Sequence, residues 1–110
     1  RSAIENVIRN ALRFTPNGTQ VEVTQSIRRD KTGTKAVLSV RDFGPGVPPG
    51  NLKNLFKPFF RAHDVKVRTS ESAGLGLAIA MRAVHMHNGL IMARNADDGG
   101  LIVEIRLPVN

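Results

Sequence analysis

The fold of this chain is set by residues 5–14, which read ENVIRNALRF and have the period of an amphipathic helix. At about 100° per residue, one arc of that helix is apolar. The arc is made by Ile4, Val7, Ile8, Ala11 and Leu12. Asn6, Asn10 and Arg13 fall within a strip of about 60° on nearly the opposite side.

This polar strip has two interpretations. Asn can offer its carbonyl oxygen to a hard cation or its amide to a phosphate, and Arg can clamp phosphate oxygens with two parallel hydrogen bonds. An ordinary solvent-facing stripe is the simpler interpretation of the helix taken alone. The rest of the chain has to decide between them.

The composition indicates one globular domain. The chain has 110 residues, of which 41% are hydrophobic and 23% charged. It has no cysteine, which excludes a disulfide framework and thiol catalysis. No signal peptide or membrane-spanning run is visible. Because the sequence starts at Arg1 with a strong helix almost at once, we expect a domain excised from a longer protein.

The charge favours an anionic partner. Sixteen Lys and Arg against nine Asp and Glu give a net charge of +7, which suits nucleotide phosphates, nucleic acid or an acidic protein surface. The aromatic residues are five Phe, too few for a base-stacking platform. Direct nucleic-acid binding is therefore the most distant of the alternatives.

Periodicity predicts the order of the elements. A helix from about Ser2 to Phe14 is followed by a β-hairpin over residues 19–42, whose first strand we expect to be half-buried. A short helix follows at 51–56, then a polar lid-like loop at about 57–73. These elements precede a second helix, at 74–88.

The second helix has few polar positions, so we expect it to be largely buried, with Gly89 as its C-terminal glycine. A closing hairpin over 90–107 alternates polar and apolar residues, so one of its faces should be buried. The whole order predicts an α+β two-layer sandwich, with one mixed sheet and helices packed on one face.

Two glycine-rich segments have chemistry of their own. Asp42 ends a strand immediately before Gly44-Pro45-Gly46, where the backbone can turn sharply and a ligand can approach closely. Its carboxylate can accept a hydrogen bond from an exocyclic amine, or form an Asx turn with its own loop. Gly74-Leu75-Gly76-Leu77 opens a helix, where free N–H groups favour an anion.

These segments stand in a specific order. Asn6-x-x-x-Asn10 is followed by Asp42-x-Gly44-Pro45-Gly46, then by the Phe-rich stretch 56–61 and the Gly74–Leu77 box. The order resembles the catalytic and ATP-binding (HATPase_c) domain of bacterial sensor histidine kinases. That domain has the GHKL or Bergerat fold of gyrase-, Hsp90- and MutL-type ATPases. The resemblance covers essentially all of residues 1–110.

The resemblance implies roles for the matching residues. Asn10 would ligate Mg²⁺, with Asn6 beside it on the phosphate side, and Arg61 would reach the γ-phosphate from a flexible ATP lid. Asn6 and Arg61 are thus the implied catalytic residues, and Asp42 would accept from the adenine amino group. Arg13 would reach the phosphates and Phe14 would lie along the adenine. The other implied ATP-binding residues are Gly44, Gly46, Val47, Ser72, Ala73, Gly74, Leu75, Gly76 and Leu77.

The resemblance also implies a reaction and partners. The domain would bind ATP with Mg²⁺ and donate the γ-phosphoryl group to a histidine on a separate dimerisation domain, upstream of a response regulator. His63, His85 and His87 resemble no phosphoacceptor, and the latter two diverge by about 200° on a helix, too far to share a metal. The parent protein would be a homodimeric inner-membrane sensor with this domain in the cytoplasm, and the isolated fragment would be monomeric.

Two departures from the family pattern keep alternatives open. Ser72-Ala73 stands where the family usually has Gly-Thr, which motivates a degenerate nucleotide-binding module without phosphotransfer. The strand that usually precedes the first helix is missing, as expected of an excised fragment. A serine kinase of the anti-sigma type shares the fold, but the stretch from Phe56 to Arg61 fits the histidine kinases better.

Overall fold

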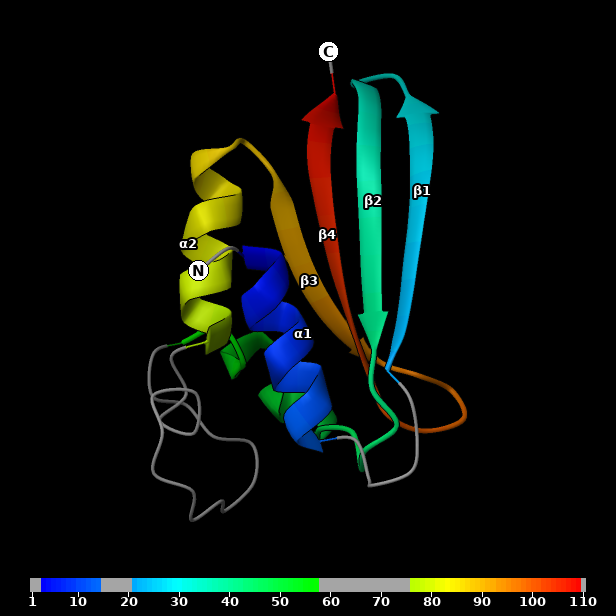
Figure 1. Ribbon diagram of the computed structural model, residues 1–110, viewed down its shortest axis with the longest axis vertical. Helices are drawn as coiled ribbons and strands as arrows, with labels where there is room; N and C mark the ends of the chain where they lie inside the picture. The colour runs from blue at the N-terminus through cyan, green and yellow to red at the C-terminus, as the bar shows by residue number, and fades with distance from the viewer. Residues whose placement is uncertain (1–2, 15–20, 58–75, 110) are drawn as a thin grey trace.

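The computed structural model describes residues 3–14, 21–57 and 76–109, without the side chains of residues 3, 10 and 12–14. Figure 1 shows its helices lying on one face of a single sheet. The predicted α+β two-layer fold is therefore confirmed. The elements are α1 (Ala3–Phe14), β1 (Glu22–Asp30), β2 (Gly33–Arg41), the 3₁₀ helix η1 (Pro49–Asn54), α2 (Gly76–Met86), β3 (Leu90–Asn95) and β4 (Leu101–Val109).

The four described strands form a sheet in the order β1-β2-β4-β3. All three strand pairs are antiparallel, where a mixed sheet was expected. The two hairpins each reverse the chain in a short turn, and β4 also lies antiparallel to β2. In the first of these turns, Asp30 accepts a hydrogen bond from the Thr32 amide at 2.8 Å, and Gly33 adopts a φ of +121°.

The prediction that the first strand is half-buried is wrong. All nine residues of β1 are exposed, including Val23 at 51% and Ile27 at 62%. The reason is its place in the sheet: β1 is an edge strand, while α1 packs mainly against β2 and α2 mainly against β3. Figure 1 shows β1 as the strand farthest from the two helices. The alternation in its sequence is therefore not matched by burial in the structure.

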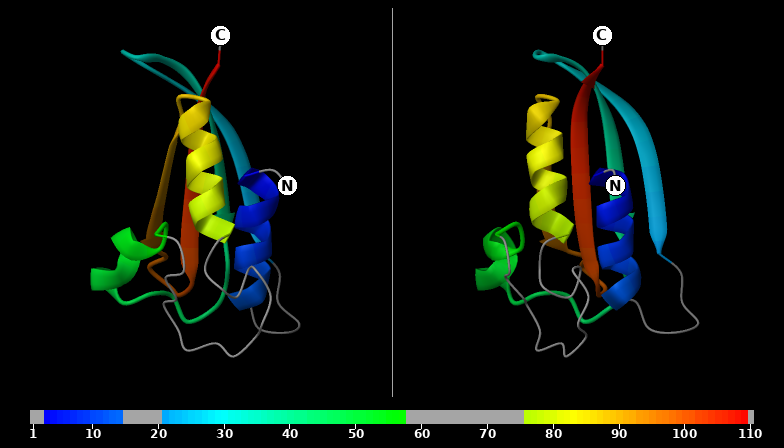
Figure 2. Two further views of the ribbon diagram at one scale, coloured as in Figure 1. Left: turned by 90° about the vertical axis from the view of Figure 1, so that its left-hand side faces the viewer. Right: turned by 60° about the vertical axis from the view of Figure 1, so that its left-hand side comes forward.

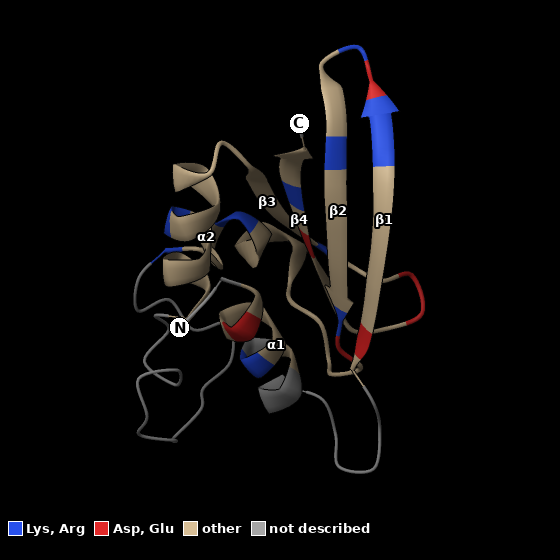
Figure 3. Cartoon of the chain, turned by 45° about the horizontal axis from the view of Figure 1, so that its top comes forward, with Lys and Arg blue, Asp and Glu red and all other residues tan. Residues whose placement is uncertain are grey.

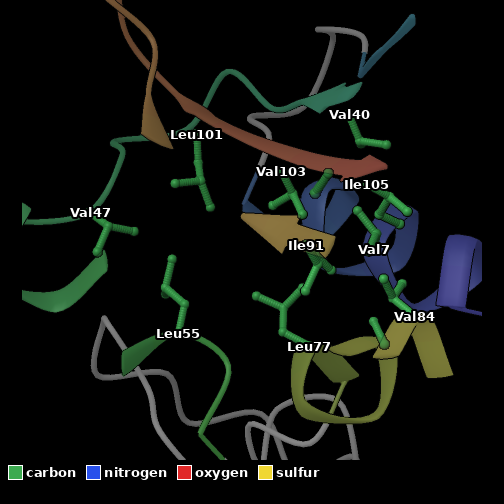
Figure 4. Packing of buried hydrophobic residues seen from close by; sticks show 12 residues of the cluster. Val7, Val40, Val47, Leu55, Leu77, Val84, Ile91, Leu101, Val103 and Ile105 are labelled. Atoms are coloured by element: carbon green, nitrogen blue, oxygen red, sulfur yellow. The ribbon is translucent and has the colours of Figure 1, made fainter. Parts of the chain in front are cut away.

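The core lies between the two long helices and the sheet, as Figure 4 shows. Val7 and Ala11 of α1 are buried, which confirms the predicted apolar arc at these positions, while Ile4 is 43% exposed. Burying one large aliphatic side chain stabilises the fold by about 1.5–3 kcal/mol. Val7 and Ala11 belong to one buried cluster, whose other members are Val40, Val47, Leu55, Leu77, Ala80, Val84, Ile91, Leu101, Val103 and Ile105.

Helix α2 is less buried than its composition suggested. Leu77, Ala80 and Val84 form a single buried stripe, while Met86 is 75% exposed. The helix thus packs like an amphipathic surface helix although most of its residues are apolar. No described helix has both the length and the apolar character needed to cross a membrane.

The end of α2 also differs from the expected glycine cap. Asn88, not Gly89, takes the left-handed conformation, with a φ of 62°. The Gly89 amide donates to the Val84 carbonyl at 2.9 Å. Glycine is needed at position 89 for space, because a Cβ there would lie 2.5 Å from the carbonyl oxygen of Arg106.

The closing hairpin buries the predicted face and one further residue. The core-facing residues of β4 are Leu101, Val103 and Ile105. Glu104 points to the other face and is also buried, with its oxygens 2.6 Å from Arg106 Nε and 3.4 Å from Arg94 Nη1. Burial raises the pKa of Glu104, but the hydrogen bond and charge of Arg106, helped by Arg94, outweigh it and hold that pKa below its ordinary value of 4.5.

Candidate active site

Helix α1 buries one of its predicted polar residues. Asn6 is only 4% exposed, and its Nδ2 has no hydrogen-bond partner among the described residues. The helix is held close to the start of α2, where a Cβ added to Gly76 would lie 3.9 Å from the Asn6 carbonyl oxygen. A solvent-facing stripe is therefore the wrong interpretation for Asn6. A buried donor without a partner costs about 1–3 kcal/mol, and it suits an anionic oxygen.

The carboxylate of Asp42 is fixed by the backbone around it. Asp42 is 3% exposed, and its Oδ1 accepts hydrogen bonds from the amides of Gly44 and Leu101, both at 3.0 Å. Its own amide donates to the Leu101 carbonyl at 2.9 Å. The bond to Gly44 is the Asx-type turn considered from the sequence. Since both bonds are made by Oδ1, the turn leaves the acceptor capacity of Oδ2 for another donor.

The loop after Asp42 is held by a residue from the other hairpin. Asn95 Oδ1 accepts from the Val47 amide at 2.9 Å, and Asn95 Nδ2 donates to the Val47 carbonyl at 2.6 Å. Gly46 has a φ of +77°, and a Cβ there would lie 2.9 Å from Asn95 Oδ1. The sequence gives no signal for this role of Asn95, which ends an expected strand just before the predicted turn Asp97–Gly100.

A second contact joins this turn to the end of β2. Arg41 Nη2 donates to Asp98 Oδ1 at 2.6 Å and to the Gly99 carbonyl at 3.0 Å. The Arg41 guanidinium also lies over the Phe43 ring, 4.6 Å from its centroid. Gly100 packs against the Asp42 carbonyl oxygen so closely that no side chain fits. The sequence offered no signal that paired Arg41 with the turn.

The fold brings the two ends of the candidate site to α1. Figures 1 and 2 show α1 with the start of α2 on one side and the loop after β2 near its C-terminal end. Leu77, from the glycine box, is 5% exposed and packs in the core with Val7. The described part of the candidate site consists of Asn6, Asp42, Gly44, Gly46, Val47, Gly76 and Leu77.

The remaining predicted site residues lie outside the described part of the chain. The side chains of Asn10, Arg13 and Phe14 are among them, as are the whole of Arg61 and residues 72–75. Their roles in binding ATP and Mg²⁺ stay predictions. Of the polar side chains expected to meet the phosphates, Asn6 is the one that the structure describes. Its buried amide, which has no acceptor among the described residues, fits a phosphate oxygen.

Comparison with known proteins gives the family. Residues 1–110 match the family described as histidine kinase-, DNA gyrase B- and HSP90-like ATPases, and the chain belongs to this family. It is 41% identical over 108 residues to the sensor histidine kinase CpxA of Escherichia coli strain K12, covering 98% of this chain and 22% of CpxA. Thus the chain is an ATP-binding catalytic domain of the histidine kinase type.

Solved structures agree with this assignment. The mycobacterial sensor histidine kinase MprB superposes with a TM-score of 0.77 at 32% identity, over 96% of this chain and 69% of that one. Full-length ShkA in complex with AMPPNP gives a TM-score of 0.70 at 26% identity, over 96% of this chain and 20% of ShkA. The chain spans about a fifth of the length of CpxA and of BaeS, two of the curated relatives it matches.

Proposed function

We propose that this domain binds Mg-ATP and donates the γ-phosphoryl group to a histidine on the dimerisation domain of the same sensor kinase. The observation that carries the proposal is the amide of Asn6, which is buried where α1 meets the start of α2 and has no acceptor in the described part of the chain. The bonds of Asp42 are explained by its own turn, but nothing among the described residues explains a buried donor without an acceptor. A phosphate oxygen would supply that acceptor.

At the base end, Asp42 would recognise adenine. Its Oδ1 is occupied by two backbone amides, which fixes the plane of the carboxylate and leaves Oδ2 to accept from the adenine amino group. The backbone of Gly44, Gly46 and Val47 would lie along the base, with Phe14 on the other side. The complex of ShkA with AMPPNP, an adenine nucleotide analogue, supports an adenine ligand for this fold.

At the phosphate end, helix α1 would present Asn6, Asn10 and Arg13 to the phosphates. Asn10 would hold Mg²⁺ through its side-chain oxygen, and the bound ion would neutralise charge on the phosphates. Arg61 would meet the γ-phosphate, and residues 72–77 would bind phosphate oxygens through backbone amides. Because an amide is a poor general base, Asn6 would not activate water, which favours transfer to an acceptor over hydrolysis.

The acceptor would dock beside α2. A groove of about 470 Å³ lies on this helix, and its lining is mainly apolar. Its lining residues are Phe56, Ala78, Met81, Arg82, His85 and Met86. An amphipathic helix of the dimerisation domain would bury its apolar face there. We place the parent protein in the inner membrane, as a homodimer with this domain in the cytoplasm and a response regulator downstream, while the isolated domain would be monomeric.

The test is phosphotransfer in trans. The domain is mixed with a separately produced dimerisation domain, Mg²⁺ and γ-labelled ATP, and acid-labile phosphohistidine is measured. Labelling of the acceptor is the expected result. ATP binding without labelling would instead support the degenerate module suggested by Ser72-Ala73. Met86→Glu should reduce labelling and leave ATP affinity unchanged, because Met86 lies in the groove and is 75% exposed.

A further inference from the structure

The turn between β3 and β4 is flanked by Asn95 and Leu101, and these two residues tie it to the two ends of the Asp42–Val47 loop. Asn95 holds Val47 by two hydrogen bonds, and Leu101 exchanges two with Asp42. Between them, the Ala96 amide donates to the Gly100 carbonyl at 2.9 Å, which closes the turn. The loop that would recognise adenine is therefore built on a second, distant segment of the chain.

The amide of Asn95 is suited to this task. One side chain both accepts from the N–H and donates to the C=O of the same residue, Val47, as a neighbouring strand would do at a sheet edge. Gly46 supports the arrangement, since its missing side chain leaves room for Asn95 Oδ1. A carboxylate at position 95 would keep the acceptor and lose the donor, and an alanine would lose both.

We propose that Asn95 is a positioning residue for base recognition: it fixes the Val47 peptide and so holds the Asp42 loop in the shape that accepts adenine. This inference rests on the proposed function. Asn95 itself contacts no nucleotide in this proposal; it acts through Val47. Arg41 supports the same loop from its other end, through Asp98, Gly99 and the Phe43 ring.

The experiment compares the affinities for ATP and GTP, measured by fluorescence titration, in the wild type and in Asn95→Ala. We expect the Kd for ATP to rise at least tenfold and the preference for ATP over GTP to fall at least threefold. In the transfer assay, the KM for ATP should rise while kcat stays within about twofold. Leu107→Ala, a core truncation at the far end of β4, is the control for stability loss and should keep the base preference.

The outcomes separate a failure of the proposed function from a failure of the inference about Asn95. A wild type that binds no ATP defeats the proposed function, whereas ATP binding with an unchanged base preference in Asn95→Ala defeats this inference alone. If Asn95→Ala does not fold, the near-isosteric Asn95→Asp gives the same comparison. In the wild type, ¹⁵N spectra should also show the Asn95 side-chain amide and the Val47 amide shifting as ATP is added, and their failure to shift would overturn the proposal.

Discussion

The two ends of the candidate site are built in different ways. At the Asp42 loop, the buried polar groups are held by the backbone and by Asn95, and one carboxylate oxygen accepts two amides. On α1, Asn6 is as buried as Asp42, at 4% against 3%, but its amide donor has no partner in the described structure.

This difference separates a loop whose geometry the protein itself fixes from a side chain whose donor is suited to a ligand. The Asp42 loop has its geometry fixed by contacts within the protein, so a change that breaks those contacts should damage both folding and base recognition. The position of Asn6 is set by the apolar packing of α1, and its amide has no partner among the described residues, so we expect this amide to be dispensable for folding and to serve a ligand. Four substitutions test this contrast, from the largest expected effect to the smallest.

Gly100→Ala should have the largest effect, because it disrupts the packing of the turn against Asp42 at the adenine end of the candidate site. Gly100 has a φ of +89°, and a Cβ there would overlap the Asp42 carbonyl oxygen. Strain of this kind costs about 1–3 kcal/mol before the overlap is counted. We expect the free energy of unfolding, measured in urea, to fall by about 3 kcal/mol or more.

The matched control is Gly99→Ala. Gly99 has a φ of +110° in the same turn, but a Cβ there would meet no atom within 4 Å. Backbone strain should then be the one cause of destabilisation, and the free energy of unfolding should fall by about 1–2 kcal/mol. Equal losses in the two variants would show that contact between the turn and Asp42 does not matter.

Asp42→Asn should weaken the preference for adenine and cause little loss in the free energy of unfolding. The remaining carbonyl oxygen can still accept from Gly44 and Leu101, but the new amide puts a donor where Oδ2 was. Loss of one such hydrogen bond, with a donor facing a donor, costs about 1–3 kcal/mol. ATP affinity should fall at least tenfold, while inosine triphosphate, which has a carbonyl in place of the amino group, should lose less.

The exposed Asp97 provides the control for charge, since Asp97→Asn removes a carboxylate from the neighbouring turn. Its ATP affinity should match that of the wild type. If Asp42→Asn weakens ATP and inosine triphosphate equally, Asp42 does not read the adenine amino group.

Glu104→Gln tests a third buried polar group, one that is paired with arginines. Because its pKa is lowered in the folded state, ionised Glu104 stabilises the fold above pH 4.5, and that stability is lost as the pH falls below this value. The variant should lose about 2 kcal/mol at pH 7, the value of a hydrogen bond to a charged group. Urea unfolding between pH 7 and pH 3 should show a smaller pH dependence in the variant than in the wild type.

Asn6→Leu should change stability least. Removing an unpaired buried donor relieves a desolvation cost, so the free energy of unfolding should stay the same or rise by about 1 kcal/mol. ATP affinity should nevertheless fall, because the phosphate would lose a donor. A loss of more than about 2 kcal/mol of stability would mean that the amide has a structural partner after all.

Some parts of the fold could be predicted because local pattern and final packing agree. The apolar arc of α1 predicted the burial of Val7 and Ala11, and the hairpins followed from alternation and turn residues. The exposure of β1 could not be predicted, because alternation records two chemically different faces and not what covers them. The same limit applies to α2, where the core covers Leu77, Ala80 and Val84 and leaves other apolar residues such as Met86 exposed.

For the candidate site, the sequence pointed to Asn6 and Asp42 because their motifs contain special residue types at fixed spacing. It did not point to Asn95 or Arg41. Their partners lie 48 and 57 residues away, and no local pattern encodes such a contact. The supporting residues of a site therefore become visible only in the structure.

The most direct test of the account is titration calorimetry of this domain with a non-hydrolysable ATP analogue, with and without Mg²⁺. The account predicts saturable binding in the micromolar to sub-millimolar range, tightened by Mg²⁺, since the fixed Asp42 loop and the unpaired Asn6 amide would both find partners. A folded domain that shows no binding with Mg²⁺ present would contradict it.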